Sequence, residues 1–225
     1  MGRLFPPEAS SFAGSIDGLI ILVTVLAGFW LLLSEGFFFW LVWRFRARPG
    51  VRSQYLDGTE KHVKRWITIP HGVVLVCDIF IIVAAIRVWV TVKQNLPAAE
   101  RTVRVVGQQW GWVFQHPGAD NSLDTADDVF TTDDMYVEQG KVYHFQLQSR
   151  DVVHSFSVPV FRLKQDAVPG RTITGWFEPT RTGTFDIQCA EICGIGHGVM
   201  LGRIHVQDQA DHAAWIAASA PSAAR

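Results

Sequence analysis

The sequence predicts two membrane-spanning helices followed by an all-β domain of the sandwich or Greek-key barrel type. Two long apolar runs near the N-terminus predict the helices, because each exceeds the roughly 20 residues that cross a bilayer. After residue 95 the pattern changes to short alternating runs separated by glycine and proline, which is typical of β-strands. We therefore expect a helical hairpin over residues 1–95 and a β domain over residues 96–225.

The two apolar runs cover about residues 18–43 and 66–92. The first run is too long for a secretory signal, and basic residues follow it where a cleavage site would need small ones. The link between the runs carries seven basic and two acidic residues, whereas Arg3 is the only basic residue before the first run. Because positively charged loops stay in the cytoplasm, we expect both termini and the β domain on the periplasmic side of a bacterial-type inner membrane.

Charge is divided unevenly between the two parts. Residues 1–95 contain ten Lys and Arg against six Asp and Glu, while residues 96–225 contain ten against fifteen. The outer domain is therefore acidic, which favours a basic soluble partner. We expect membrane lipid and protein partners, and no nucleic acid.

Six alternating runs predict strands in the β domain, and the tail from Ala210 to Ala218 predicts a short helix. The runs are Thr102–Val106, Tyr143–Leu147, Phe156–Val158, Thr172–Thr174, Thr184–Ile187 and Gly202–Val206.

The segment from Cys189 to Met200 is the strongest candidate site, because twelve residues contain two thiols, an imidazole and a thioether. Sulfur and imidazole ligands are typical of copper, zinc or iron–sulfur centres, and an added Met favours copper in electron transfer. Two cysteines are one more than a mononuclear blue-copper site uses, which indicates two thiolates bridging two copper ions. A disulfide between Cys189 and Cys193 is the alternative, although a three-residue spacer makes a strained loop. His154, at the end of a distant β run, is the best candidate for a second imidazole.

The segments DVVHSFSVP, DAVPGR and QCAEICGIGHGVM carry a resemblance to subunit II of haem–copper cytochrome c oxidases, which extends from about Ser11 to Val206. The resemblance implies a cupredoxin domain that holds the dinuclear copper centre CuA. It also implies the ligands: His154, Cys189, Cys193, His197, Met200 and the backbone carbonyl of Glu191. The Glu191 side chain would help to hold Mg²⁺ at the boundary with subunit I. The chain has no Cys-x-x-Cys-His motif, so we expect no haem on it.

The function that this resemblance implies is electron transfer within a terminal oxidase. The chain would accept electrons from cytochrome c or another small donor at CuA and pass them to the haem of subunit I, where O₂ is reduced to water with proton pumping. Two alternatives remain: a subunit of a CuA-containing nitric oxide reductase, and a membrane-anchored copper carrier. The full set of copper ligands argues against a third alternative, a quinol oxidase subunit II, which has the same helices and barrel but lacks those ligands.

Trp110 is the expected point where electrons enter, because the family has a Trp–aromatic–Trp run above CuA. Here Gly111 replaces the middle aromatic residue, and core packing of Trp110 and Trp112 is the alternative interpretation.

Several acidic residues have open roles. Val63 occupies the position where related subunits carry a glutamate at the mouth of a proton path, and Glu60 lies nearby. Glu35 and Asp78 lie inside the apolar runs, where a charge is costly, so we hypothesise that one of them faces subunit I and replaces that glutamate. The loop Asp120–Asp128 is either a Ca²⁺ site, a solvated acidic turn or a patch that docks a basic protein.

Overall fold

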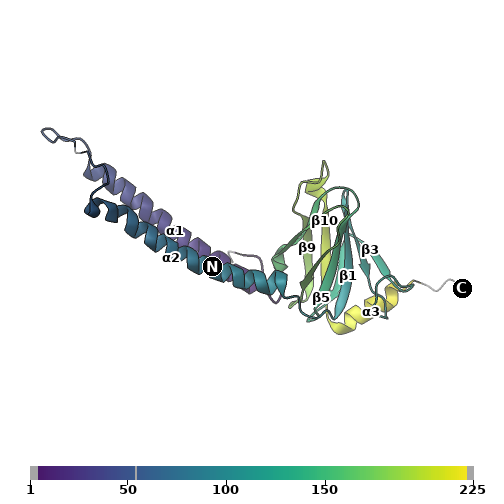
Figure 1. Ribbon diagram of the computed structural model, residues 1–225. Coiled ribbons are helices and arrows are strands. Elements are labelled where there is room, and N and C mark those ends of the chain that lie inside the picture. Colours follow the sequence, from purple (N-terminus) through teal and green to yellow (C-terminus); the bar gives the residue numbers. More distant parts are fainter. Residues whose placement is uncertain (1–4, 54, 222–225) are drawn as a thin grey trace. The chain divides into compact units, whose positions relative to one another are not determined.

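The computed structural model describes residues 5–53 and 55–221, which form two compact units (Figure 1). One unit runs from Asp17 to Trp89 and contains most of the two long helices. The other unit combines the described residues before Asp17 with those from Val90 onward, and it contains the β domain.

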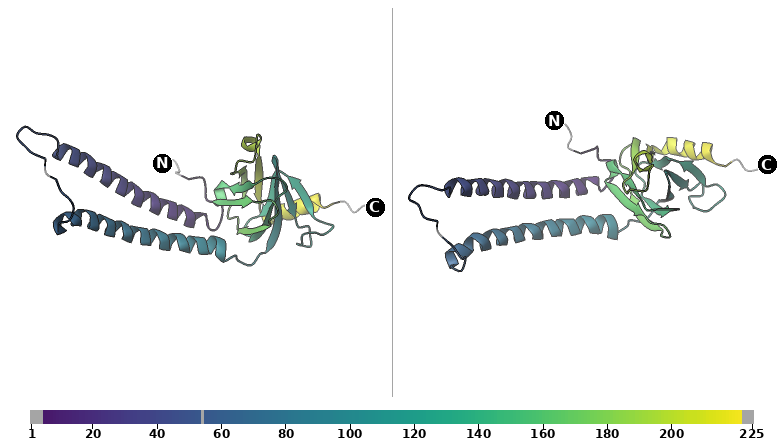
Figure 2. Two further views of the ribbon diagram at one scale, coloured as in Figure 1. Left: turned by 45° about the horizontal axis from the view of Figure 1, so that its top comes forward. Right: turned by 90° about the horizontal axis from the view of Figure 1, so that it is seen from above.

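The helical unit is built from α1 (Ala13–Arg44) and α2 (Lys61–Trp89), and α2 continues into a π-helical turn, η1 (Val90–Gln94). Both are long and continuous in the two views of Figure 2. Each is long and apolar enough to cross a membrane: the mean hydropathy over an 18-residue segment reaches 2.4 in Ala13–Arg44 and 2.6 in Lys61–Gln94. Large apolar side chains are exposed along both helices, as expected for surfaces that face lipid or other membrane proteins.

The β domain is a sandwich of two five-stranded sheets. The strand order is β3-β2-β1-β5-β8 in one sheet and β4-β10-β9-β6-β7 in the other. The strands are β1 (Arg101–Gln108), β2 (Gly111–His116), β3 (Val129–Thr132), β4 (Asp134–Glu138), β5 (Tyr143–Ser149), β6 (His154–Val158), β7 (Leu163–Ala167), β8 (Ile173–Phe177), β9 (Gly183–Cys189) and β10 (Leu201–Gln207). The predicted fold class, a two-helix hairpin followed by a β-sandwich of the cupredoxin type, is confirmed.

Alternation along the strands builds the core of the sandwich. In β1, Val103 and Val105 are buried while their neighbours are half-buried, and β5 buries Phe145 and Leu147 in the same way. The facing sheet contributes Phe156 among other fully buried side chains. Each sheet includes one parallel pair, β1 with β5 and β10 with β4, so strands distant in the sequence become neighbours.

Two segments outside the strands complete the domain. Before α1, Ala9 and Phe12 are buried, and the ring of Phe12 packs edge-on against Trp176. At the other end of the chain, α3 (Gln209–Ser219) begins after Asp208, whose carboxylate accepts a hydrogen bond from the Asp211 N–H. This helix is one residue longer at each end than the pattern of the tail predicts.

Candidate metal centre

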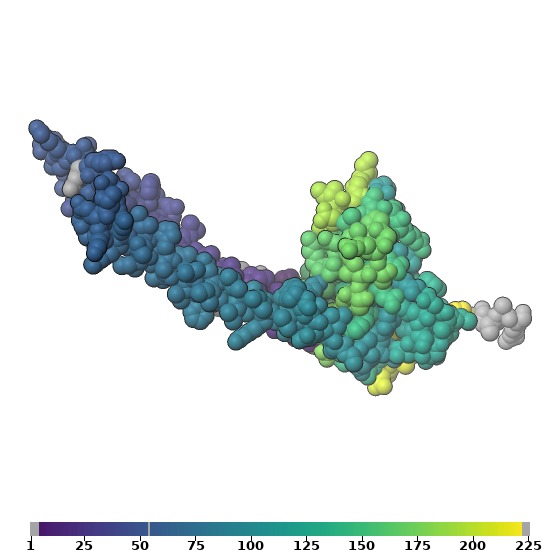
Figure 3. Space-filling view, in the orientation of Figure 1, coloured from purple at the N-terminus to yellow at the C-terminus, as the bar shows by residue number. Residues whose placement is uncertain are grey.

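The predicted metal loop lies between two neighbouring strands of one sheet. It leaves β9 at Cys189 and enters β10 after Met200. Antiparallel pairing sets Leu201 opposite Gln188, and the Cys189 N–H donates to the Met200 carbonyl at 3.2 Å. The sheet therefore holds the two ends of the loop side by side. In Figure 3 this segment, in yellow-green, protrudes at one end of the β domain.

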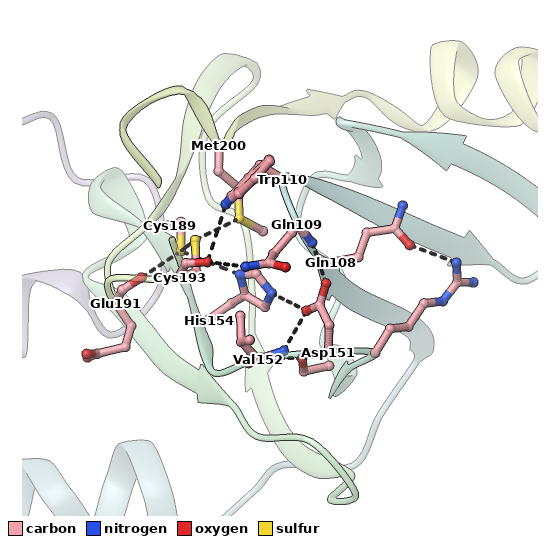
Figure 4. Close-up of polar contacts among 12 residues, drawn as sticks. Gln108, Gln109, Trp110, Asp151, Val152, His154, Cys189, Glu191, Cys193 and Met200 are labelled. Atoms are coloured by element: carbon pink, nitrogen blue, oxygen red, sulfur yellow. Dashed lines mark hydrogen bonds and ion pairs between the residues drawn. The ribbon is translucent and has the colours of Figure 1, made fainter. Parts of the chain in front are cut away.

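Three sulfur atoms meet inside the loop (Figure 4). The sulfur of Cys193 lies 3.7 Å from the sulfur of Cys189 and 3.7 Å from the thioether of Met200. A disulfide has a bond of about 2.05 Å, so the two cysteines are separate thiols in this structure.

Two imidazoles and one carbonyl face the same sulfurs. The Nδ1 atom of His154 lies 4.0 Å from the Cys189 sulfur, and the Nδ1 atom of His197 lies 3.7 Å from the Cys193 sulfur. The carbonyl oxygen of Glu191 is 3.2 Å from the Cys189 sulfur. Pairing of Phe156 on β6 with Cys189 on β9 explains how His154 reaches a loop that is distant in the sequence. All six residues predicted as ligands are thus brought together.

The spacing and chemistry of these atoms fit a metal ion. Two ligand atoms bound to one metal at 2.0–2.3 Å lie about 3.3–3.8 Å apart in tetrahedral geometry. The separations of 3.7 and 4.0 Å between sulfur and nitrogen atoms are close to that range. Thioether, thiol and imidazole together form a soft donor set of the kind that copper prefers.

Three of the proposed ligand residues are shielded from water. His154 and Met200 are fully buried, and Cys193 is 3% exposed. Burial, with the nearby Cys189 sulfur, raises the pKa of the Cys193 thiol to about 11. This thiol is therefore protonated at neutral pH in the metal-free chain, and binding of a metal ion there releases the proton.

Comparisons with known proteins identify the family. The family model for the periplasmic domain of cytochrome c oxidase subunit II matches residues 101–207. The alternative cytochrome c oxidase subunit 2 of Bradyrhizobium diazoefficiens is 33% identical over 228 residues, which cover 90% of this chain and 79% of that protein. This chain belongs to the cytochrome c oxidase subunit II family.

Other members of the family are similar over comparable lengths. Cytochrome c oxidase subunit 2 of Cereibacter sphaeroides is 29% identical over 249 residues, covering 96% of this chain and 79% of the relative. A solved periplasmic domain of subunit II from Bradyrhizobium japonicum is 32% identical and covers 56% of this chain and 96% of that chain, with a TM-score of 0.48. This subunit II chain is accordingly a membrane-anchored component of an oxidoreductase complex in electron transport, and the cluster of His154, Cys189 and Cys193 is its candidate copper site.

The two tryptophans of the predicted relay have different environments. Trp112 is fully buried in the core, with its ring centroid 6.1 Å from that of His154. Trp110, in the turn between β1 and β2, is 43% exposed, and its Nε1–H donates to the Cys193 carbonyl at 3.3 Å. Trp112 is therefore a core residue, whereas Trp110 lies at the surface and is hydrogen-bonded to the metal loop.

Two glycines of the loop make room for Trp110. A Cβ atom on Gly196 would lie 2.4 Å from Cδ2 of the indole. Gly194 has a positive φ of 121°, and a Cβ atom there would lie 3.3 Å from the same ring. Close contact with Trp110 is therefore a physical reason for glycine at both positions.

Asp151 and Gln109 are site residues that the sequence analysis missed. Asp151 Oδ1 lies 2.8 Å from Nε2 of His154, and Asp151 Oδ2 accepts the Gln109 N–H at 2.7 Å. The Gln109 side chain donates to the Cys193 carbonyl at 2.7 Å. Although partial burial works against ionisation, hydrogen bonds from His154 and from backbone N–H groups lower the pKa of Asp151. The only signal in the sequence was the position of Asp151, three residues before His154.

Exposed apolar side chains of the β domain gather on the segments that build the site. Of the eight large hydrophobic residues exposed in the described part of the domain, seven lie there: Trp110, Val152, Val153, Ile192, Ile195, Val199 and Leu201. Ile195, between the two glycines that contact Trp110, is 99% exposed. An apolar area of this kind on a protein surface is typical of a binding interface.

Carboxylates of the acidic loop Asp120–Asp128 accept hydrogen bonds from other groups of the β domain. Arg104 donates two hydrogen bonds to Asp124, at 2.7 and 2.9 Å. This guanidinium lowers the pKa of Asp124 to about 2. Asp128 accepts hydrogen bonds from the Asp124 N–H and the Gln115 side chain. These contacts favour the acidic-turn interpretation, because they occupy the oxygen atoms that a Ca²⁺ ion would need.

Within the helical unit, Asp78 lines a mostly apolar groove of about 670 Å³ between α1 and α2. Ser34 and His71 are the other polar lining residues apart from the indoles of Trp30 and Trp66. Glu60 is exposed at the start of α2 and lies 3.1 Å from His62. The role of Glu35 or Asp78 in proton uptake stays a prediction.

Proposed function

We propose that the chain is the copper-carrying subunit of a haem–copper terminal oxidase. It accepts electrons from cytochrome c or another small donor at CuA and delivers them to the haem of subunit I, which reduces O₂ to water with proton pumping. The observation that supports this most is the meeting of six donor groups, two of them thiols 3.7 Å apart, of which His154, Cys193 and Met200 are buried.

The proposed ligands are His154, Cys189, Cys193, His197, Met200 and the backbone carbonyl of Glu191. When bound, two copper ions held by these residues would supply one-electron chemistry. The residues of the chain keep the donor atoms fixed, because β6, β9 and β10 hold the loop ends in one sheet. Burial of His154 and Met200 shields one part of the centre from water. Fixed ligands and this shielding keep reorganisation small when the charge changes.

Trp110 is the proposed point where electrons enter. Its ring is partly exposed to solvent, and its Nε1–H donates a hydrogen bond to the backbone carbonyl of Cys193, a proposed ligand. A single residue therefore connects the protein surface to Cys193. The apolar surface at Ile195, beside this ring, supplies contact area for a donor protein.

Glu191 is proposed to have two functions at once. Its carbonyl faces the Cys189 sulfur, while its side chain is exposed. An exposed carboxylate next to the centre is suited to bind Mg²⁺ at the boundary with subunit I.

The proposed topology has residues 1–95 as a membrane hairpin and residues 96–225 as a periplasmic domain. The basic link between α1 and α2 supports a cytoplasmic loop, so that both termini lie in the periplasm of a bacterial-type inner membrane.

Copper stoichiometry and electron paramagnetic resonance of the full-length chain test the proposal. We expect two copper ions per chain and hyperfine splitting by two equivalent copper nuclei. Cys189→Ser and Cys193→Ser should lose that signal, whereas Cys77→Ser, which changes the third cysteine in α2, should retain it.

A single copper ion with an ordinary one-nucleus pattern would contradict the dinuclear site and favour a copper carrier. Turnover of the whole complex, compared with O₂ and with NO, distinguishes an oxidase from a nitric oxide reductase.

A further inference from the structure

We propose that Asp151 is a positioning residue that fixes the His154 ring for metal binding and ties the Trp110 turn to it. The inference rests on the proposed function, since it concerns how the same centre is held. It assigns a role to a carboxylate that does not itself face the sulfur atoms.

The first observation is that the two ring nitrogens of His154 face different groups. Nε2 of His154 lies 2.8 Å from Asp151 Oδ1, and Nδ1 lies 4.0 Å from the Cys189 sulfur. An ionised carboxylate only accepts hydrogen bonds, so Nε2 must carry the hydrogen atom. The neutral ring then presents the lone pair of Nδ1 to the sulfurs, which is the form that binds a metal ion.

The second observation is that the ring has little freedom. His154 is fully buried, and its ring packs at an angle of 63° against Trp112. A Cβ atom on Gly107 would lie only 3.0 Å from the imidazole Cδ2 atom and 3.2 Å from the Trp112 ring, so the strand backbone also lies close to both rings. Packing thus confines the ring, and the hydrogen bond to Asp151 selects the tautomer within that confined position.

The third observation is that the same carboxylate holds the turn that carries Trp110. Asp151 Oδ2 accepts the Gln109 N–H at 2.7 Å, and Oδ1 also accepts the Val152 N–H at 2.7 Å. The Gln109 side chain and the Trp110 indole both donate to the Cys193 carbonyl. The turn is therefore fastened on one side to Cys193 and on the other, through Asp151, to His154 (Figure 4).

These contacts make Asp151 the link between the exposed indole and a buried imidazole. An asparagine at this position keeps the size of the side chain but supplies only one acceptor oxygen. Its amide group can no longer accept from both His154 and Gln109. We therefore expect Asp151→Asn to weaken the tautomer preference and loosen the turn together.

Nitrogen NMR of the copper-free, full-length chain in detergent, labelled at histidine, tests the tautomer directly. We expect the wild-type His154 to carry hydrogen on Nε2 alone, and Asp151→Asn to give a mixture of tautomers. The control is Asp133→Asn. Asp133 accepts the N–H of Trp112, which lies in the same hairpin as Gln109, and none of its described hydrogen bonds goes to His154. This control should leave the His154 signals unchanged.

Copper binding gives a second measurement. Competition with a copper chelator should show an affinity about 10- to 100-fold lower in Asp151→Asn, with an altered resonance spectrum, and little change in Asp133→Asn. Hydrogen on Nδ1 in the wild type, or unchanged tautomer and copper affinity in Asp151→Asn, would overturn the inference. If the wild type binds one copper ion only, the proposed function fails, while the tautomer measurement still decides the role of Asp151.

Discussion

Two buried histidines, His116 on β2 and His212 on α3, make the stability of the β domain depend on pH. His116 is 2% exposed and meets the Trp215 ring edge-on, and His212 is 3% exposed and stacks on the same ring. Burial, with the adjacent His212, lowers the pKa of His116 from 6.5 to about 3. Burial, with the Arg101 guanidinium, lowers the pKa of His212 from 6.5 to about 4, although Glu138 partly opposes this.

The sign of the effect follows from proton binding. Between about pH 4 and 6.5 the unfolded chain binds a proton on each histidine and the folded chain does not, so the free energy of unfolding falls as the pH falls. At pH 5, which is 1.5 units below the unfolded pKa of 6.5, each histidine lowers the free energy of unfolding by about 2 kcal/mol. The two together should lower it by roughly 4 kcal/mol relative to neutral pH.

Other groups with shifted pKa values titrate outside this range. Hydrogen bonding lowers the pKa values of Glu100, Asp124 and Asp127, so their contributions to stability are constant above pH 5 and are lost only at lower pH. The interval from pH 5 to 7 therefore isolates the effect of His116 and His212.

Urea unfolding of the copper-free, full-length chain in detergent, followed by tryptophan fluorescence, measures the free energy of unfolding at each pH. Copper is removed because a bound metal adds its own pH-dependent stability. We expect His212→Gln to reduce the loss between pH 7 and pH 5 to about 2 kcal/mol. The reasoning is refuted if the wild type loses no stability over this interval, or if the variant loses as much as the wild type.

Three substitutions test the site. Gly196→Ala should displace Trp110, since the new Cβ would lie 2.4 Å from the ring, and should slow electron uptake from reduced cytochrome c about tenfold or more while the copper signal persists. A Cβ atom on Gly198 would meet no atom within 4 Å, so Gly198→Ala should keep the wild-type rate of electron uptake. Equal rates in the Gly196 and Gly198 variants would contradict the role of the contact between Gly196 and Trp110. Ile195→Ser should raise the donor KM roughly fivefold, about 1 kcal/mol, without changing the rate at saturation, and an unchanged KM would exclude this side chain from donor binding. Met200→Leu keeps the volume of a fully buried side chain, so it should change the unfolding free energy by less than about 1.5 kcal/mol and yet shift the copper spectrum and potential. A wild-type spectrum would remove Met200 from the ligand set.

The fold was largely predictable because its signals are local. Uninterrupted apolar runs predict α1 and α2, and alternation predicts β1, β5, β6, β8, β9 and β10. The strands β2, β3, β4 and β7 were missed. The segment of β7 (Leu163–Ala167), for example, contains only two buried residues, at its ends, so its sequence shows no clear alternation.

The ligand set was predictable for a different reason. Five of the six donors lie in the twelve residues from Cys189 to Met200, where the spacing of two thiols, an imidazole and a thioether indicates a shared site. His154 was the best candidate for a second imidazole, and the resemblance to subunit II supplied the Glu191 carbonyl. The sequence could not reveal which neighbours hold these donors in place.

By itself the sequence determined that soft ligands occur in one loop, that two helices are long enough to cross a membrane, and that residues 96–225 are acidic. Only the tertiary structure decided that Trp110 is exposed while Trp112 is buried, and that Asp151 joins Gln109 to His154. The physical reason is the sequence separation of these contacts. Gln109 and Asp151 are 42 residues apart, and they meet because β1 and β5 pair in parallel and bring the ends of both strands to the metal centre.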